Sequence, residues 1–168
     1  MKLGILSDTH NHLPATRRAL ETLLAAGATE IVHCGDIGPD ALRLLSRQCE
    51  RAGIRAHVAI GNCDARWTGD LPYLPAPPNV DLSRFPSFEA DGKRCAACHG
   101  HQAWILENAL LSGEYAYLFT GHTHRPADER TGPTRLINPG SAAEPRTDAG
   151  PTAAILDPAT DTLSLLPL

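Results

Sequence analysis

Short polar motifs rich in Asp and His recur along the chain, and these are the residues that could do chemistry. The motifs are SDTHNH at 7–12, HCGDIG at 33–38, GNCD at 61–64, CHGH at 98–101 and GHTH at 121–124. Together they offer carboxylate oxygens, an amide oxygen and several imidazole nitrogens. This mixture suits Mn, Fe, Co, Ni or Zn better than Mg or Ca, which prefer shells made only of oxygen.

The spacing within the motifs indicates one shared cavity. In D-x-H (Asp8 and His10) and H-x-H (His122 and His124), two side chains on an extended strand end leave on the same side, because side-chain direction alternates along a strand. One carboxylate can bridge two ions about 3.5–4 Å apart, and such a pair clamps the attacking and leaving oxygens of an in-line phosphoryl displacement. We therefore expect metal-assisted chemistry on a phosphate ester.

The elements that must position these motifs alternate between strand and helix in the first third of the chain. Apolar runs predict strands at 3–7, 30–34 and 54–60, and amphipathic runs predict helices at 14–27 and 39–53. Two strand–helix–strand units imply a parallel sheet. Ligands bind outside the carboxyl ends of such strands, so Asp8, His10, Asp36 and Asn62 should converge there.

The second half of the chain predicts a long loop and then a different arrangement of strands. Residues 61–80 are crowded with Gly, Pro, Asn and Asp and predict a long loop. Beyond it we expect one helix near 101–112 and more antiparallel strands, near 81–89, 93–98, 115–120, 126–137 and 152–166. The fold class is therefore α/β with a mixed or two-sheet core. Without a repeat or linker to divide it, the chain is interpreted as one domain over 1–168.

Composition narrows the function classes. The net charge is −4 and there is no basic run, so no nucleic-acid backbone partner is indicated. The five cysteines are odd in number and lack a disulfide-scaffold spacing. No run has the length of a signal-peptide core or a bilayer span. We expect a cytoplasmic protein with no membrane partner, one that acts on a small phosphate ester; homo-oligomerisation stays open.

The order of the motifs resembles that of the metal-binding blocks of the calcineurin-like metallophosphoesterase superfamily. The motifs are D-x-H, G-D, G-N-x-D, H and G-H-x-H. The segment Asn138-Pro139-Gly140-Ser141 and the small size resemble its YfcE-like branch. The resemblance implies two packed mixed β-sheets flanked by helices, two divalent transition-metal ions (Mn favoured, with Fe, Ni, Co or Zn as alternatives), and a metal-bridging hydroxide as nucleophile. It also implies the ligands: Asp8, His10 and His124 for one ion, Asn62, His99 and His122 for the other, with Asp36 bridging.

Cys63 departs from the pattern that many phosphomonoesterases of this superfamily show. They carry His at this position, where it is thought to assist the leaving group or hold the phosphate, whereas a thiol is a weak donor and no cationic partner. A monoanionic diester suffers less from this loss than a dianionic monoester, so we favour a phosphodiesterase. The catalytic set is then Asp36, Asn62, Cys63, Asp64 and His99, with the role of Asp64 open. The alternatives are a phosphomonoesterase and a non-catalytic scaffold resembling the retromer subunit of this fold.

Other conspicuous residues receive plainer interpretations. We expect His33 and His57 to be partly buried strand histidines and His12 to be an exposed loop imidazole. His101 either supports a ligand or caps a helix. The remaining motifs are interpreted as core thiols (Cys95, Cys98), a proline-stiffened surface loop (Trp67, Tyr73) and a tight turn near the site (138–141).

Overall fold

The computed structural model describes residues 1–64 and 76–168, so most of the predicted 61–80 loop, with Trp67 and Tyr73, lies outside the described residues. The first of two sheets has six strands in the order β11-β10-β1-β2-β3-β4. Its strands are β1 (Leu3–Leu6), β2 (Glu30–His33), β3 (Arg55–Ala59), β4 (Val80–Ser83), β10 (Thr152–Asp157) and β11 (Thr162–Pro167). Strands β1 to β4 are parallel, and β10 runs antiparallel to both β1 and β11.

The second sheet has five strands in the order β5-β6-β7-β9-β8. They are β5 (Ser87–Ala90), β6 (Lys93–Ala97), β7 (Tyr117–Phe119), β8 (Pro126–Thr131) and β9 (Thr134–Pro139). The inner pairs β6–β7 and β7–β9 are parallel, and the outer pairs are antiparallel. Both sheets are therefore mixed.

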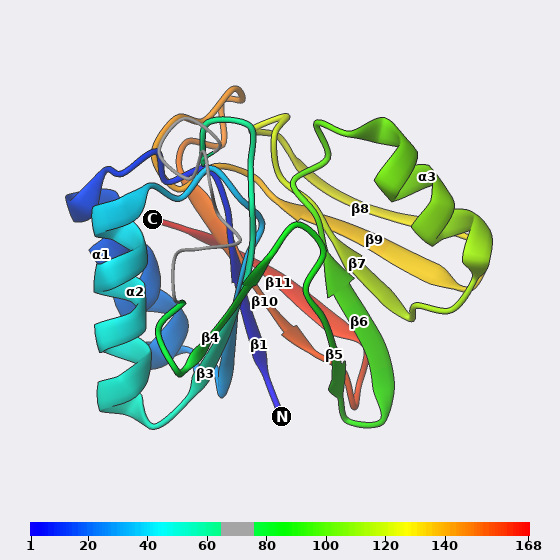
Figure 1. Ribbon diagram of the computed structural model, residues 1–168, viewed down its shortest axis with the longest axis horizontal. Helices are drawn as coiled ribbons and strands as arrows, with labels where there is room; N and C mark the ends of the chain where they lie inside the picture. Colours follow the sequence, from blue (N-terminus) through cyan, green and yellow to red (C-terminus); the bar gives the residue numbers. More distant parts are fainter. Residues whose placement is uncertain (65–75) are drawn as a thin grey trace.

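Among the described residues, three helices flank the two sheets and complete a four-layer arrangement (Figure 1). Helices α1 (Leu13–Ala25) and α2 (Pro39–Ala52) pack on the outer face of the first sheet through a core that includes Leu20, Leu45 and Ile31. Helix α3 (Ala103–Ser112) covers the outer face of the second sheet. A separate core that includes Ile5, Val32 and Phe119 fills the space between the sheets. The predicted fold class, two packed mixed sheets flanked by helices, is confirmed.

Local sequence explains where α1 begins and where α2 begins and ends. The His12 ring accepts a hydrogen bond from Ala15 N–H and so caps α1. Pro39 stands in the first turn of α2, where its missing N–H is harmless. Gly53 ends that helix with a left-handed φ of 68° that favours glycine.

Three predicted strands are wrong in extent. The run 81–89 is divided between β4 in one sheet and β5 in the other, because residues 84–86 carry the chain from one layer to the next. The runs 126–137 and 152–166 are each a hairpin, β8–β9 and β10–β11. Turns at Gly132 and Asp161, both with positive φ, reverse the chain inside each run.

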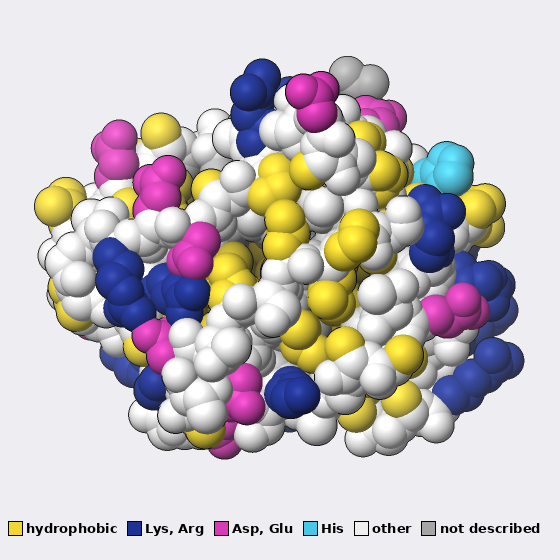
Figure 2. All heavy atoms as spheres, turned by 180° about the vertical axis from the view of Figure 1, so that it is seen from behind, with side chains coloured by type: hydrophobic (Ala, Val, Ile, Leu, Met, Phe, Trp, Pro, Cys, Tyr) yellow, Lys and Arg dark blue, Asp and Glu magenta, His cyan; other side chains and the backbone are white. Residues whose placement is uncertain are grey.

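The back of the molecule shows a band of apolar side chains with charged groups on either side (Figure 2). Strand β11 is an edge strand of the first sheet, and Leu165 on it is 45% exposed.

Within the described residues, no helix combines the length and apolar character needed to cross a bilayer.

A charged cluster joins the two sheets at the end away from the polar motifs. Asp161, in the β10–β11 turn, accepts hydrogen bonds from Tyr117 Oη at 2.9 Å and Arg135 Nη1 at 2.7 Å, and from Arg130. Burial alone would raise the pKa of Asp161, but these donors hold it at about 2. The cluster therefore connects the first sheet to β7, β8 and β9 of the second.

Candidate metal centre

The polar loops that follow the strands converge beyond the strands' carboxyl ends, as the sequence predicts. Asp8, directly beyond β1, is fully buried. Its Oδ2 accepts hydrogen bonds from Ser7 Oγ at 2.6 Å and from the backbone N–H of His122 at 3.1 Å. The other oxygen, Oδ1, is thereby directed toward the imidazoles of the site.

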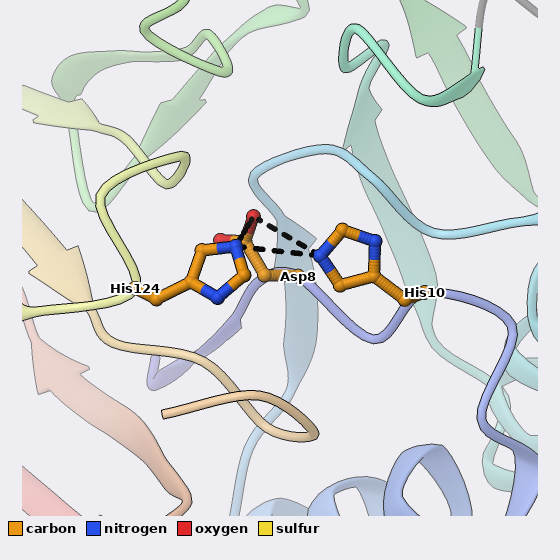
Figure 3. Close-up of side chains that lie close together, drawn as sticks. All are labelled: Asp8, His10 and His124. Atoms are coloured by element: carbon orange, nitrogen blue, oxygen red, sulfur yellow. Dashed lines mark hydrogen bonds and ion pairs between the residues drawn. The ribbon is translucent and has the colours of Figure 1, made fainter. Parts of the chain in front are cut away.

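The first group of side chains is Asp8, His10 and His124, which point toward one another (Figure 3). His124 Nε2 lies 3.1 Å from Asp8 Oδ1 and 3.3 Å from His10 Nε2. His124 Nδ1 lies 2.5 Å from the carbonyl oxygen of Glu144, to which it can donate. That contact fixes the ring so that Nε2 can offer its lone pair to an ion.

A second group joins Asp36, three residues beyond β2, to His99, two residues beyond β6, and to Asp8. His99 Nε2 lies 3.3 Å from Asp36 Oδ2 and 3.9 Å from Asp8 Oδ1. Burial lowers the pKa of His99, but the Asp36 and Asp8 carboxylates outweigh this and raise it. Burial raises the pKa of Asp36, while His99 and the Cys63 backbone more than reverse the effect, so its pKa lies below the usual range. Asp36 is therefore a carboxylate at neutral pH.

Two buried atoms test whether cations fit this centre. Among the described residues, Asp8 Oδ1 and His99 Nε2 are buried without a hydrogen-bond partner. Buried polar groups are normally satisfied, and an unsatisfied one needs an explanation. Both atoms face Asp36 or the imidazoles at distances that a bound cation can span. The donor set of carboxylates and imidazoles therefore fits divalent transition metals.

The two remaining predicted ligands, His122 and Asn62, lie outside the two groups of side chains. The His122 ring lies 5.1 Å from the His99 ring, centroid to centroid. Asn62 is exposed, and its amide donates to Cys63 Sγ at 3.5 Å. Cys63 donates its backbone N–H to Asp36 Oδ1 at 2.8 Å, and its thiol is grouped with His10 and Asp36. Five of the seven predicted ligands therefore belong to the two groups, while the His122 ring lies beside His99 and Asn62 precedes Cys63 in the chain.

The predicted strand alternation of the D-x-H and H-x-H side chains is wrong, although these side chains do converge. Asp8, His10, Asp36, His122 and His124 all have positive φ, between 46° and 65°. These residues therefore lie in left-handed turns beyond the strands, and alternation along an extended strand does not apply. Such conformations cost about 1–3 kcal/mol each for residues with a side chain and are typical of functional sites.

Buried polar side chains outside the predicted set hold these turns. Gly35 N–H donates to His33 Nδ1 at 3.2 Å, which leaves Nε2–H to donate to Thr9 Oγ1 at 3.1 Å. Thr9 Oγ1 in turn donates to the carbonyl of Ile37. Burial lowers the pKa of His33 to about 3, so the ring is neutral. The chain of hydrogen bonds ties the Asp8 turn to the Asp36 turn.

The segment 138–141 supports the other turns. Ser141 Oγ donates to the backbone carbonyl of Asp8 at 2.9 Å, and Asn138 Nδ2 donates to that of Gly121 at 2.8 Å. The predicted turn is therefore next to the site. Sequence reasoning missed the contacts of His33 and Ser141, which join residues far apart along the chain and leave no local pattern.

Several single-residue expectations are now decided. His33 and His57 are buried strand histidines, with His57 Nε2 3.1 Å from Glu30 Oε2. His12 caps α1 and is thus more than an exposed loop imidazole. His101 caps no helix, since Gln102 is the N-cap of α3, and its ring lies 5.4 Å from that of His99. Cys95 and Cys98 are buried thiols, as predicted.

Comparison with known proteins agrees with this geometry. The family model of the calcineurin-like phosphoesterase superfamily domain matches residues 1–161. The chain belongs to this superfamily. Accordingly, it is a phosphoric ester hydrolase.

Relatives from this superfamily cover nearly the whole chain. It is 32% identical to phosphodiesterase MJ0936 of Methanocaldococcus jannaschii, over 94% of this chain and 93% of that protein. It is 33% identical to phosphodiesterase YfcE of Escherichia coli K12, over 100% and 92%. A solved archaeal phosphodiesterase superposes with a TM-score of 0.82 at 29% identity and covers both chains fully. Vps29 of Entamoeba histolytica shares the fold alone, with a TM-score of 0.67 at 19% identity over 98% and 90% of the chains.

Proposed function

We propose that this protein is a phosphodiesterase that works with two divalent transition-metal ions. The observation that carries the proposal is the pair of unsatisfied buried atoms, Asp8 Oδ1 and His99 Nε2, which lie 3.9 Å apart in one group with the Asp36 carboxylate. Asp8, His10 and His124 would hold one ion; Asn62, His99 and His122 would hold the other; Asp36 would contact both. A bound pair of this kind activates water and neutralises charge on the transferring phosphoryl group.

The chain's own residues would orient the reaction. Ser7 and the His122 backbone fix the Asp8 carboxylate. His99 Nδ1 lies 2.9 Å from the carbonyl of Cys34, to which it donates, and Nε2 then faces Asp36. The Glu144 carbonyl orients His124 in the same way. Ligand side chains that are held from behind lose little freedom when they bind an ion.

Cys63 supports the choice of diester over monoester. Its backbone N–H is bonded to the Asp36 carboxylate, so its side chain stands at the edge of the metal centre. A thiol there offers no positive charge to a dianionic monoester, and it is a weak donor to a poor leaving group. The two relatives named phosphodiesterases, at 32% and 33% identity, support the same choice.

The test is steady-state kinetics on bis-p-nitrophenyl phosphate and p-nitrophenyl phosphate, with Mn²⁺ and after chelation. We expect the wild type to prefer the diester, to lose activity with chelator and to regain it with Mn²⁺. General acid assistance is worth about 10²–10⁴-fold, so Cys63→His should raise monoesterase activity. Cys63→Ser, which adds no imidazole, is the matched control and should leave the substrate preference unchanged. A wild type that prefers the monoester, or works without metal, would contradict the proposal.

We propose that the protein works in a reducing compartment, the cytoplasm, because its cysteines form no disulfide among the described residues. All five are free thiols, and four of them are buried.

A further inference from the structure

Asp64 occupies a position that the proposed chemistry does not use. It stands two residues after Asn62 and is 2% exposed. Within the part of the chain that the structure describes, its carboxylate accepts hydrogen bonds from four backbone N–H groups. These belong to Asp36 at 2.9 Å, Ile37 at 3.0 Å, Gly38 at 3.1 Å and Gly61 at 2.8 Å.

The four donors make an anion-binding concavity rather than a set of scattered contacts. Three of them are successive residues, and both Asp36 and Gly38 have positive φ, which turns neighbouring N–H groups toward one point. Gly38 is also the N-cap of α2, where a helix favours a negative charge. The Asp64 carboxylate therefore fixes the shape of the turn that carries Asp36.

The same carboxylate joins this turn to the one that carries Asn62. Asp64 Oδ2 accepts from both Asp36 N–H and Gly61 N–H. In return, Asp36 Oδ1 accepts the backbone N–H of Cys63 at 2.8 Å. The two turns are so close that a Cβ on Gly61 would lie 2.0 Å from Asp36 Oδ1. Each turn thus supplies a carboxylate that binds the backbone of the other.

We infer that Asp64 is a positioning residue that sets Asp36 and Asn62 at the separation one metal ion requires. This inference rests on the proposed function, in which both residues bind the ion shared with His99 and His122. The other ion shares only Asp36 with this pair of turns. Loss of the Asp64 carboxylate should therefore weaken the Asn62 ion much more than the Asp8 ion.

The experiment is a titration of the full-length apo protein with Mn²⁺ alone, followed by electron paramagnetic resonance. The technique counts bound ions and reports the magnetic coupling of a bridged pair. We expect two coupled ions in the wild type. Asp64→Asn replaces one acceptor oxygen with a donor that faces two N–H groups. Outer partners of ligands typically contribute 10–100-fold in metal affinity, so one ion should bind about 10–100-fold more weakly and the coupled signal should fade.

The matched control is Thr134→Val. Thr134 is also fully buried, and its Oγ1 donates to the Tyr115 carbonyl at 2.7 Å, but it lies at the start of β9. This variant should lose thermal stability and keep both ions. If Asp64→Asn does not fold, Asp64→Glu is used in its place. This variant moves the two carboxylate oxygens by one methylene, and we again expect the Asn62 ion to be weakened much more than the Asp8 ion.

The outcomes separate the two proposals. A wild type that never binds a coupled pair refutes the two-metal function itself. A wild type with a coupled pair, together with an Asp64 variant that binds both ions normally or weakens both equally, refutes the positioning role alone.

Discussion

Gly121 lies so close to the Asp8 carboxylate that one added methyl group tests the packing of the metal centre. A Cβ at residue 121 would lie 2.0 Å from Ser7 Oγ and 2.8 Å from Asp8 Oδ2. Gly121→Ala must therefore displace Ser7 and break its 2.6 Å hydrogen bond to Asp8. Overpacking costs about 1–3 kcal/mol and a lost bond to a charged group about 1.5–3 kcal/mol, so the free energy of unfolding should fall by about 2.5–6 kcal/mol.

Two measurements check this expectation. In a chain of this size the loss corresponds to a melting temperature lower by roughly 5–24 °C, measured by calorimetry with chelator present. Because Asp8 loses a hydrogen bond that orients it, Mn²⁺ affinity should fall about 10–100-fold. The control is Gly53→Ala at the end of α2, where a Cβ meets no atom within 4 Å but the left-handed φ costs about 1–2 kcal/mol. A melting temperature no lower than that of Gly53→Ala, with unchanged Mn²⁺ affinity, would refute the reasoning.

Three further predictions address other parts of the molecule. His124→Ala should remove the ion bound by Asp8, and His122→Ala the other; anomalous scattering from crystals of each variant would show which ion is lost, and the opposite result would overturn the pairing. Asp161→Asn should remove stability that the wild type has above about pH 4 and loses as the pH falls toward the Asp161 pKa of about 2. Because that side chain is 37% exposed, we expect only about 1 kcal/mol, measured by urea unfolding at pH 7 and pH 2.5; a difference as large at pH 2.5 as at pH 7 would contradict it. Iodoacetamide should label Cys63 first, because the other four thiols are buried; peptide mass spectrometry would identify the site, and faster labelling of a buried thiol would count against the described packing.

Much of the fold could be predicted because strong local patterns coincide with it. The strands at 3–7, 30–34 and 54–60 and the helix at 39–53 follow continuous apolar runs or a helical stripe with a glycine stop, and each forms close to the expected bounds. The hairpins at 126–137 and 152–166 were harder, because Gly132 or Asp161 reverses the chain inside a run that is uniformly favourable to strands. A run of strand-forming residues does not show whether the chain continues straight or turns back.

The candidate site divides in the same way. Its side chains were predictable because polar motifs follow the parallel strands, whose carboxyl ends meet at one edge. The hydrogen bonds that hold those side chains could not be predicted, because they involve backbone groups that only the fold brings together. Asp64 binds N–H groups 26 to 28 residues away, and Ser141 binds a carbonyl 133 residues away. Contacts between residues so far apart along the chain leave no periodic signal in the sequence.

The left-handed turns explain why so many buried polar residues surround this site. Each turn directs a ligand inward at a conformational cost of about 1–3 kcal/mol, and each exposes backbone groups that no regular ladder can satisfy. Asp64 binds those of the Asp36 turn, Ser141 those of the Asp8 turn and Asn138 those of the Gly121 turn. The hydrogen bonds of these three residues therefore hold the strained turns that carry the ligands.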